Sequence, residues 1–218
     1  CGLLRVNGMR ELFYAAASLT AMKPVKSDRL AILTNGGGMG VLATDTLISE
    51  GGKLAKLSAE TLRKLNQKLP VNWSHGNPID IVGDAGPERY SDALQIIQED
   101  EEVDAVLVLN CPTAVASSTQ AAEAVLNIAQ NNDHCLLVSW VGSATAEKSR
   151  KLFAEQNIPS YATPEAAVNS FMHLVRYKQN QDILMETPPA LAADLTFDSD
   201  KAWGVIAKVI SEGREWLN

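Results

Sequence analysis

The stretch RLAILTNGGGMG, residues 29–40, decides the fold of this 218-residue chain. Residues 30–33 are apolar and predict a short buried strand. A run rich in glycine follows this strand, and residues 39–50 then predict a helix that Gly51 and Gly52 close. A strand, a glycine-rich turn and a helix in this order are typical of the first unit of an open α/β sheet.

The remaining sequence alternates strand-like and helical segments in the same way. Short apolar runs predict further strands at 54–57, 103–109, 135–140 and 158–163. Helices are predicted at 9–22, 58–69, 88–99, 117–130, 144–156, 164–177 and 201–217. Strands that alternate with helices form a parallel sheet. We therefore predict the α/β class: a flavodoxin-like doubly wound parallel sheet of about five strands with helices on both faces, plus flanking N- and C-terminal helices.

Three segments are predicted along the chain. Residues 1–26 form an N-terminal linker helix, and residues 27–178 form the flavodoxin-like domain. Residues 179–218 contain a linker rich in Pro and Asp and a C-terminal helix. Because that helix is amphipathic, it needs either the domain or a missing neighbour to pack on.

The composition is that of an ordinary soluble globular protein, with 46% hydrophobic and 21% charged residues. The net charge of −7 argues against a nucleic-acid partner, because phosphate backbones are bound by clustered Lys and Arg. No apolar stretch approaches the roughly 20 residues of a membrane span, so no membrane partner is expected. Cys1, Cys111 and Cys135 have neither metal-ligand nor disulfide spacing, which indicates a cytoplasmic protein.

The candidate phosphate-binding residues follow the first strand directly. They are Asn35, Gly36, Gly37, Gly38, Met39 and Gly40. Glycine lets backbone amides approach a ligand, and the following helix adds the positive end of its dipole, so the loop favours an anion such as a phosphoryl group. The sequence is neither a Walker A loop nor a full G-x-G-x-x-G motif. A tight strand-to-helix turn that needs glycine for packing is the alternative explanation.

A second candidate lies in the long stretch 70–87, which contains three prolines and three glycines and is predicted to be irregular. Asn77 and Asp80, in the sequence NPID, either orient a reacting group or cap the turn around Pro78. Both explanations stay open at the level of the sequence.

No catalytic or metal-binding set is predicted, because His75, His134 and His173 each stand alone. Four loop hydroxyl groups near predicted strand ends could donate hydrogen bonds to an anion: Ser74, Ser117, Ser118 and Thr119. Helix N-capping explains Ser117 and Ser118 equally well. A flavin-binding module is a further alternative, and it would need more aromatic residues near the strand ends than Trp73 and Trp140.

Four stretches together resemble one family in their order and spacing: RLAILTNGGGMGVLATD (29–45), LAKLSAETLRKLNQKLP (54–70), GNPIDIVGDAGPERY (76–90) and VDAVLVLNCP (103–112). They resemble the flavodoxin-like ligase-CoA domain of the NDP-forming acyl-CoA synthetases, relatives of succinyl-CoA synthetase. The resemblance implies that 27–178 is the CoA-ligase domain. It also implies that the loop 35–40 faces a phosphohistidine supplied by another domain, with Asn77 and Asp80 of the Asn-Pro-x-Asp signature near the same face.

The resemblance further implies what lies outside this chain. The family's histidine belongs to a Ser-His-Thr-Gly-like segment upstream of the residues that match 1–6, so none of the histidines here takes its place. An ATP-grasp domain would follow Asn218. We therefore expect the CoA-binding, histidine-bearing and ATP-grasp domains of the same polypeptide as partners, and a homo-oligomer is also open. The parent enzyme would use CoA and ATP with Mg, whereas the fragment alone would hold no cofactor and be inactive.

One further stretch, FMHLVRYKQNQDILMETP (171–188), resembles the bacterial protein lysine acetyltransferases that carry a GNAT-type domain on this synthetase scaffold. This resemblance implies an alternative function. The chain would then be an acyl-CoA-sensing scaffold domain of an acetyltransferase and would have no synthetase activity.

Overall fold

The computed structural model describes residues 2–130, 134–186, 198–214 and 216. The chain divides into two compact units, Cys1–Leu184 and Met185–Asn218. The elements in chain order are α1 (Met9–Ala21), β1 (Arg29–Thr34), α2 (Gly37–Ser49), β2 (Lys53–Leu54), α3 (Ala59–Lys68), β3 (Ile79–Asp80), α4 (Pro87–Gln98), β4 (Ala105–Asn110), α5 (Ser118–Ala129), β5 (Cys135–Trp140), α6 (Ala144–Glu155), β6 (Ser160–Tyr161), α7 (Pro164–Met185) and α8 (Ser199–Ser211).

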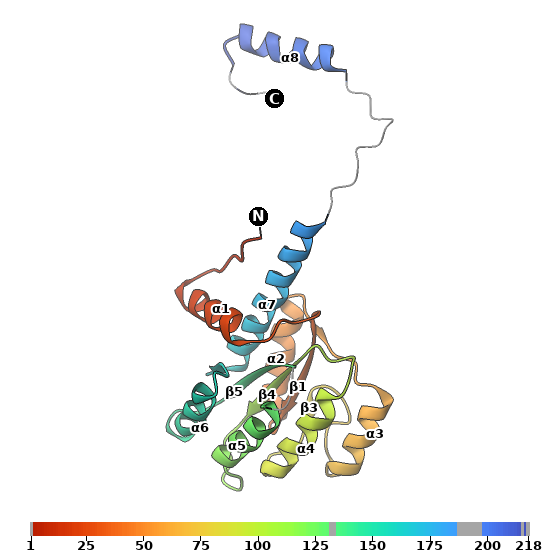
Figure 1. Cartoon of the computed structure of the whole chain (residues 1–218), viewed down its shortest axis with the longest axis vertical. Helices are drawn as coiled ribbons and strands as arrows, with labels where there is room; N and C mark the ends of the chain where they lie inside the picture. The colour runs from red at the N-terminus through yellow and green to blue at the C-terminus, as the bar shows by residue number, and fades with distance from the viewer. Residues whose placement is uncertain (1, 131–133, 187–197, 215, 217–218) are drawn as a thin grey trace. The chain divides into compact units, whose positions relative to one another are not determined.

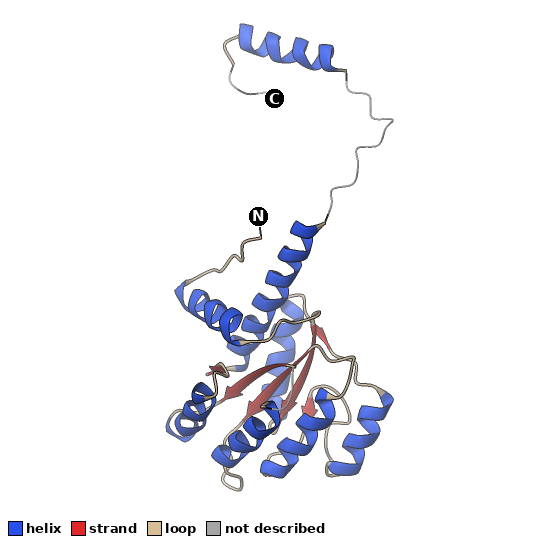
Figure 2. Ribbon diagram, viewed as in Figure 1, coloured by secondary structure: helices blue, strands red, loops and turns tan. Residues whose placement is uncertain are grey.

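The strands form one parallel six-stranded sheet in the order β2-β1-β4-β5-β6, with β3 also paired to β1 (Figure 2). The predicted α/β fold with a parallel sheet is confirmed. Strand β3 was not predicted, because it lies in the stretch rich in proline and glycine at 70–87 and is only two residues long. A segment that short shows no hydrophobic periodicity.

Helices cover both faces of the sheet (Figure 1). Helices α3, α4, α5 and α6 pack on one face, where Val106 and Val108 of β4 join one hydrophobic cluster. Helices α2 and α7 pack on the other face with Leu107 and Leu109, and Tyr14 and other partly buried residues of α1 pack there too. Alternate residues of a strand point to opposite faces, so a doubly covered strand is apolar throughout. This is why the predicted bounds of β4 and β5 lie close to the observed ones.

Two chain segments differ from their predicted extents. Helix α7 runs to Met185 instead of ending near Tyr177. The polar run KQNQD, residues 178–182, interrupts the apolar stripe, so the sequence pattern indicated an earlier end. The predicted domain boundary at 178 therefore lies inside a continuous helix. The C-terminal helix is α8, which is capped by Asp198, and the predicted linker residues 187–197 lie outside the described residues.

Helix α1, predicted as a linker helix, packs against the edge of the sheet. Ser18 Oγ and the Tyr161 hydroxyl group are hydrogen-bonded at 2.7 Å, and the Tyr14 and Tyr161 rings meet edge-on at 5.4 Å. Such aromatic pairs add stability beyond the area that they bury. Strand β6 thus holds α1 as part of the first unit.

The Asn77 side chain completes the outer edge of β1. Strand β1 pairs with β2 at Arg29 and Leu30 and with β3 at Leu33 and Thr34. Between these pairings, Asn77 Oδ1 accepts a hydrogen bond from the Ile32 backbone N–H at 3.0 Å, and Nδ2 donates to the Leu30 carbonyl at 2.9 Å. Nδ2 also donates to the Ala55 carbonyl at 2.9 Å. The amide therefore pairs the Ile32 N–H between the two strand pairings and gives a second partner to the Leu30 carbonyl, which also accepts from the Ala55 N–H at 2.9 Å.

We predict that Asn77→Ala lowers the free energy of unfolding by about 2–4 kcal/mol, because it leaves buried backbone groups unpaired. Urea unfolding followed by tryptophan fluorescence measures this loss. The matched control is Asn72→Ala, which alters an exposed asparagine of the same loop and should leave the midpoint unchanged. Equal midpoints for the two variants would contradict the role assigned to Asn77.

His173 of α7 is 3% exposed, and its Nδ1 has no hydrogen-bond partner among the described residues. Burial lowers the pKa of His173 below its usual value of 6.5. Glu11 and Glu50 oppose this effect, whereas Arg176 adds to it. The folded chain therefore holds His173 neutral at a pH where the unfolded chain already protonates it.

Because the pKa of His173 is lower in the folded state, we predict that its contribution to stability is complete above about pH 6.5 and is lost as the pH falls below that value. Urea midpoints at pH 7.5 and 5.5 test this. His173→Leu should show a smaller fall in midpoint between the two pH values than the unchanged chain. An identical fall in both proteins would show that other groups govern the pH dependence.

Candidate functional site

The candidate site lies at the carboxyl edge of the sheet, where β1, β3 and β4 end at Thr34, Asp80 and Asn110. Ligands of open α/β sheets bind at this edge. The Asn35 side chain joins two of these strand ends, since Nδ2 donates to the Cys111 carbonyl at 2.9 Å and Oδ1 accepts from the Cys111 N–H at 2.8 Å. Asn35 is buried, so its amide group serves the architecture of the edge and does not face solvent.

Helix α2 starts within the glycine stretch, at Gly37 instead of at the predicted Met39. Its N-cap is Gly36, and no side chain caps this helix end in the described part of the chain. Glycine is a poor helix former, which is why the sequence pattern placed the start too late. The backbone N–H groups of the first turn of α2 therefore lie directly after the end of β1.

Packing explains three of the four glycines in this stretch. A Cβ atom on Gly36 would meet Cys111 Sγ at 2.7 Å, and one on Gly37 would meet Asp80 Oδ2 at 2.8 Å. A Cβ atom on Gly40 would meet Pro78 Cβ at 3.1 Å. Gly38 differs, because a Cβ atom there would have no atom within 4 Å. The packing alternative therefore accounts for every glycine except Gly38.

Asp80 joins the site, and Asn77 does not, although both belong to the NPID sequence. Asp80 Oδ1 accepts a hydrogen bond from the Val82 N–H at 2.9 Å, and its other carboxylate oxygen lies against Gly37. The Asp80 N–H donates to Ser74 Oγ at 2.8 Å. The Asn77 amide is hydrogen-bonded at the edge of β1 through Oδ1 and through both hydrogens of Nδ2, so it does not bind a ligand.

Cys111 and Thr34 belong to the site but were not predicted there. Thr34 Oγ1 accepts from the Gly36 N–H at 3.0 Å and so holds the turn into α2. Burial raises the pKa of the Cys111 thiol, and the Asp80 carboxylate adds to the rise, so this thiol stays protonated at neutral pH. Their positions, at the last residue of β1 and directly after β4, were the only signal in the sequence.

The three histidines are engaged elsewhere. The His75 ring is hydrogen-bonded to Asn66 Oδ1 at 2.8 Å and to the Val71 carbonyl at 2.9 Å, and it lies against the Trp73 ring. His173 is buried in α7, and His134 precedes β5 at the opposite edge of the sheet. Ser117 caps α5 by accepting from the Gln120 N–H at 3.3 Å, which confirms the capping explanation for that residue.

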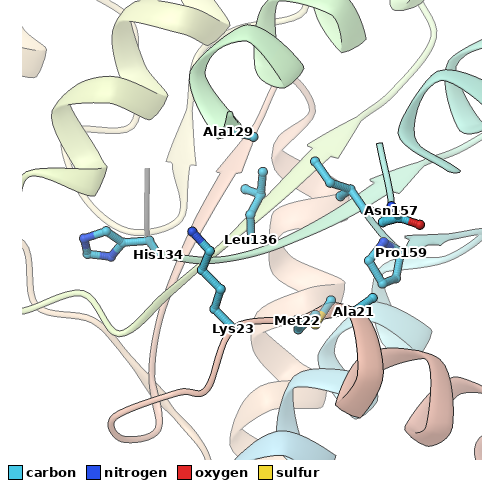
Figure 3. A pocket seen from close by; sticks show the side chains of 9 residues that line it. Ala21, Met22, Lys23, Ala129, His134, Leu136, Asn157 and Pro159 are labelled. Atoms are coloured by element: carbon cyan, nitrogen blue, oxygen red, sulfur yellow. The ribbon is translucent and has the colours of Figure 1, made fainter. Parts of the chain in front are cut away.

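A pocket with His134 and Lys23 in its wall lies at the amino ends of β5 and β6 (Figure 3). Its volume of about 90 Å³ is far below the roughly 300–1,000 Å³ of small-molecule sites. Among the described residues, no group of His, Cys, Asp and Glu is arranged to hold a metal ion. In the same part of the chain, no helix combines the length and apolarity needed to cross a membrane.

Comparison with known proteins identifies the family. Residues 30–185 match the Ligase-CoA domain. The chain is 36% identical over 212 residues, 97% of its length, to acetate–CoA ligase (ADP-forming) I of Archaeoglobus fulgidus, of which it covers 29%. It is 32% identical over 184 residues, 82% of its length, to the alpha subunit of acetate–CoA ligase (ADP-forming) II of Pyrococcus furiosus, of which it covers 40%.

A solved structure supports the same assignment. The dinucleotide-forming acetyl-coenzyme A synthetase 1 of Ca. Korarchaeum cryptofilum, in complex with phosphate and ADP, superposes with a TM-score of 0.82 at 28% identity. The match covers 87% of this chain and 41% of that one. This chain thus spans less than half the length of these relatives. With the match to the family model over most of its length, the chain belongs to the Ligase-CoA domain family of the NDP-forming acyl-CoA synthetases.

Proposed function

We propose that this chain is the phosphoryl-facing domain of a multidomain ADP-forming acyl-CoA synthetase. In this function, the N-terminal end of α2 receives a phosphohistidine that another domain presents. The observation that carries the proposal is Gly38, an exposed glycine in the first turn of α2 whose presence packing does not explain. A glycine at this position leaves the helix end open to close approach by a phosphoryl group.

The charges around α2 support this function and restrict the direction of approach. The helix dipole places partial positive charge at the N-terminal end of α2. The Asp80 carboxylate lies against Gly37 and would repel a phosphoryl dianion on that side. The phosphoryl group would therefore approach the first turn from the side of Gly38, where a Cβ atom would have no atom of the described residues within 4 Å.

The names of the relatives suggest the substrates of the whole enzyme. Two relatives described above are ADP-forming acetate–CoA ligases, and another, from Nitrosopumilus maritimus, is 4-hydroxybutyrate–CoA ligase (ADP-forming), so we propose a short-chain acyl group with CoA and ATP. Mg²⁺ would accompany the nucleotide. The other domains of the same enzyme would bind CoA and ATP and carry the histidine. Within the loop 35–40, the backbone N–H groups of Gly37 and Gly38 would contact the phosphoryl group in transit, because those of Gly36, Met39 and Gly40 already donate within the turn.

We predict that Gly38→Glu in the full-length enzyme lowers the rate of acyl-CoA formation by about 100-fold or more, because a carboxylate then occupies the helix end. The fold should tolerate the change, since the new side chain meets open space. Coupled assay of acyl-CoA formation and a thermal melt measure the two effects. Gly204→Glu, the same substitution at an uncrowded glycine of α8, should leave both unchanged. Full activity in Gly38→Glu would contradict the proposed function.

The resemblance of residues 171–188 stated in the sequence analysis gives a second candidate function, that of a domain of a lysine acetyltransferase. In that case the domain would transmit acyl-CoA binding to an acetyltransferase domain of the same protein. The relatives described above are named as CoA ligases or a CoA synthetase, so the synthetase function remains our first proposal.

Products of the full-length protein distinguish the two functions. Incubation with acetate, ATP and CoA should form acetyl-CoA if the protein is a synthetase. Incubation with acetyl-CoA and a lysine-containing protein should form acetyl-lysine, detected by mass spectrometry, if it is an acetyltransferase. Acetyl-lysine without acetyl-CoA synthesis would replace the first proposal with the second.

A further inference from the structure

Helix α1 is held to the rest of the first unit by a small contact. Two of its 13 residues are buried, Ala15 and Ser18. Its N-cap is Gly8, which has no side chain to cap the helix. Isolated helices of this length are marginally stable in water. The helical state of α1 therefore depends on its contact with β6 and α7, beside which it lies (Figure 1).

The side of α7 that faces α1 includes His173. A cavity of about 130 Å³ lies between the two helices, with Leu174 and Tyr177 of α7 in its wall. Leu19 and Met22 of α1 line the same cavity. His173 is buried and lies four residues before Tyr177, so the two share one side of the helix. We call these five residues the α1–α7 contact, and the cavity within it shows that the two helices pack incompletely.

The His173 ring is buried without the partner that a charged imidazole needs. Its Nδ1 has no hydrogen-bond partner in the segments that the structure describes. In the protonated ring both nitrogens are donors. A buried N–H group without an acceptor is costly, and a buried charge is more so. Protonation of His173 is therefore unfavourable while the α1–α7 contact is closed.

The charged groups that face His173 do not remove this cost. They are Glu11 of α1, Glu50 after α2 and Arg176 of α7. Glu50 is ion-paired with Arg176 at 2.5 Å, and Glu11 Oε2 accepts a hydrogen bond from the Asn7 N–H at 2.7 Å. Burial outweighs both carboxylates, so the pKa of His173 stays below 6.5. The other titratable side chains at this contact are Tyr14, Tyr161, Tyr177 and Lys178.

We infer that α1 is a strap that is released when His173 is protonated. The closed α1–α7 contact holds the ring neutral, whereas the open contact gives the protonated ring access to water. Release uncovers Tyr161, which Tyr14 and Ser18 of α1 contact in the closed state. Tyr161 belongs to β6, the strand at one edge of the sheet. Edge strands can pair with other chains, so the strap covers this edge near neutral pH and exposes it in acid.

Amide hydrogen exchange measured by mass spectrometry tests the strap in the 218-residue chain at pH 7.5 and 5.5. Protection factors are obtained after correction for the intrinsic pH dependence of exchange. Peptides from α1 report on the strap, and peptides from β4 and β5 report on the core. His173→Leu removes the titrating ring, and His173→Gln removes it but keeps a polar side chain. The matched control is His75→Gln, at an exposed histidine that is hydrogen-bonded within its own loop and to α3.

We predict that the protection of α1 falls by about threefold or more between pH 7.5 and 5.5, within the roughly tenfold per pH unit that uptake of one proton allows. At both pH values α1 should be less protected than β4 and β5, because it opens without global unfolding. The fall should persist in His75→Gln and vanish in both His173 variants.

Three results would overturn the strap. The first is an unchanged protection of α1 between the two pH values in the unchanged chain. The second is a fall that persists in His173→Leu and His173→Gln, since another group would then be responsible. The third is equal protection of α1 and the core, because α1 would then open only when the whole unit unfolds.

Discussion

The pairing of strand β1 on both of its edges is the constraint on which the rest of the structure depends. One edge pairs with β4 from Leu30 to Thr34. The other edge is divided between β2 and β3, and the Asn77 amide fills the interval. A buried strand cannot leave main-chain groups unpaired, so this composite edge fixes where β1 ends and where α2 begins. The candidate site is built on that end.

At the start of α2, packing explains some of the glycines, and the proposed binding function explains Gly38. A Cβ atom would meet Cys111 Sγ at 2.7 Å on Gly36 and Asp80 Oδ2 at 2.8 Å on Gly37, and it would be in tight contact with Pro78 on Gly40. The same crowding brings a carboxylate against the positive end of the helix. Of these four glycines, only Gly38 remains uncrowded. The binding properties we propose are therefore located on one side of the helix end.

The sequence predicted the elements that are covered on both faces and misjudged those that are not. Strand β5 was predicted at 135–140 and is observed as Cys135–Trp140, because every residue of it is buried and its apolar run has sharp limits. Strand β3 was not predicted, because a segment of two residues shows no hydrophobic periodicity. The end of α7 was misplaced because exposed turns near Lys178 and Asp182 carry no apolar pattern, although an ion pair stabilises them.

The sequence by itself determined the alternation of strands and helices, the parallel sheet and the glycine stretch that follows the first strand, because these are local patterns. Only the tertiary structure decided the different positions of Asn77 and Asp80, which lie three residues apart in one loop. One fills a gap in the sheet edge, and the other lies at the helix end. Likewise, only the fold brings Cys111 to Asn35. Such contacts join residues distant in the sequence through the pairing of parallel strands, and local periodicity has no information about which strands become neighbours.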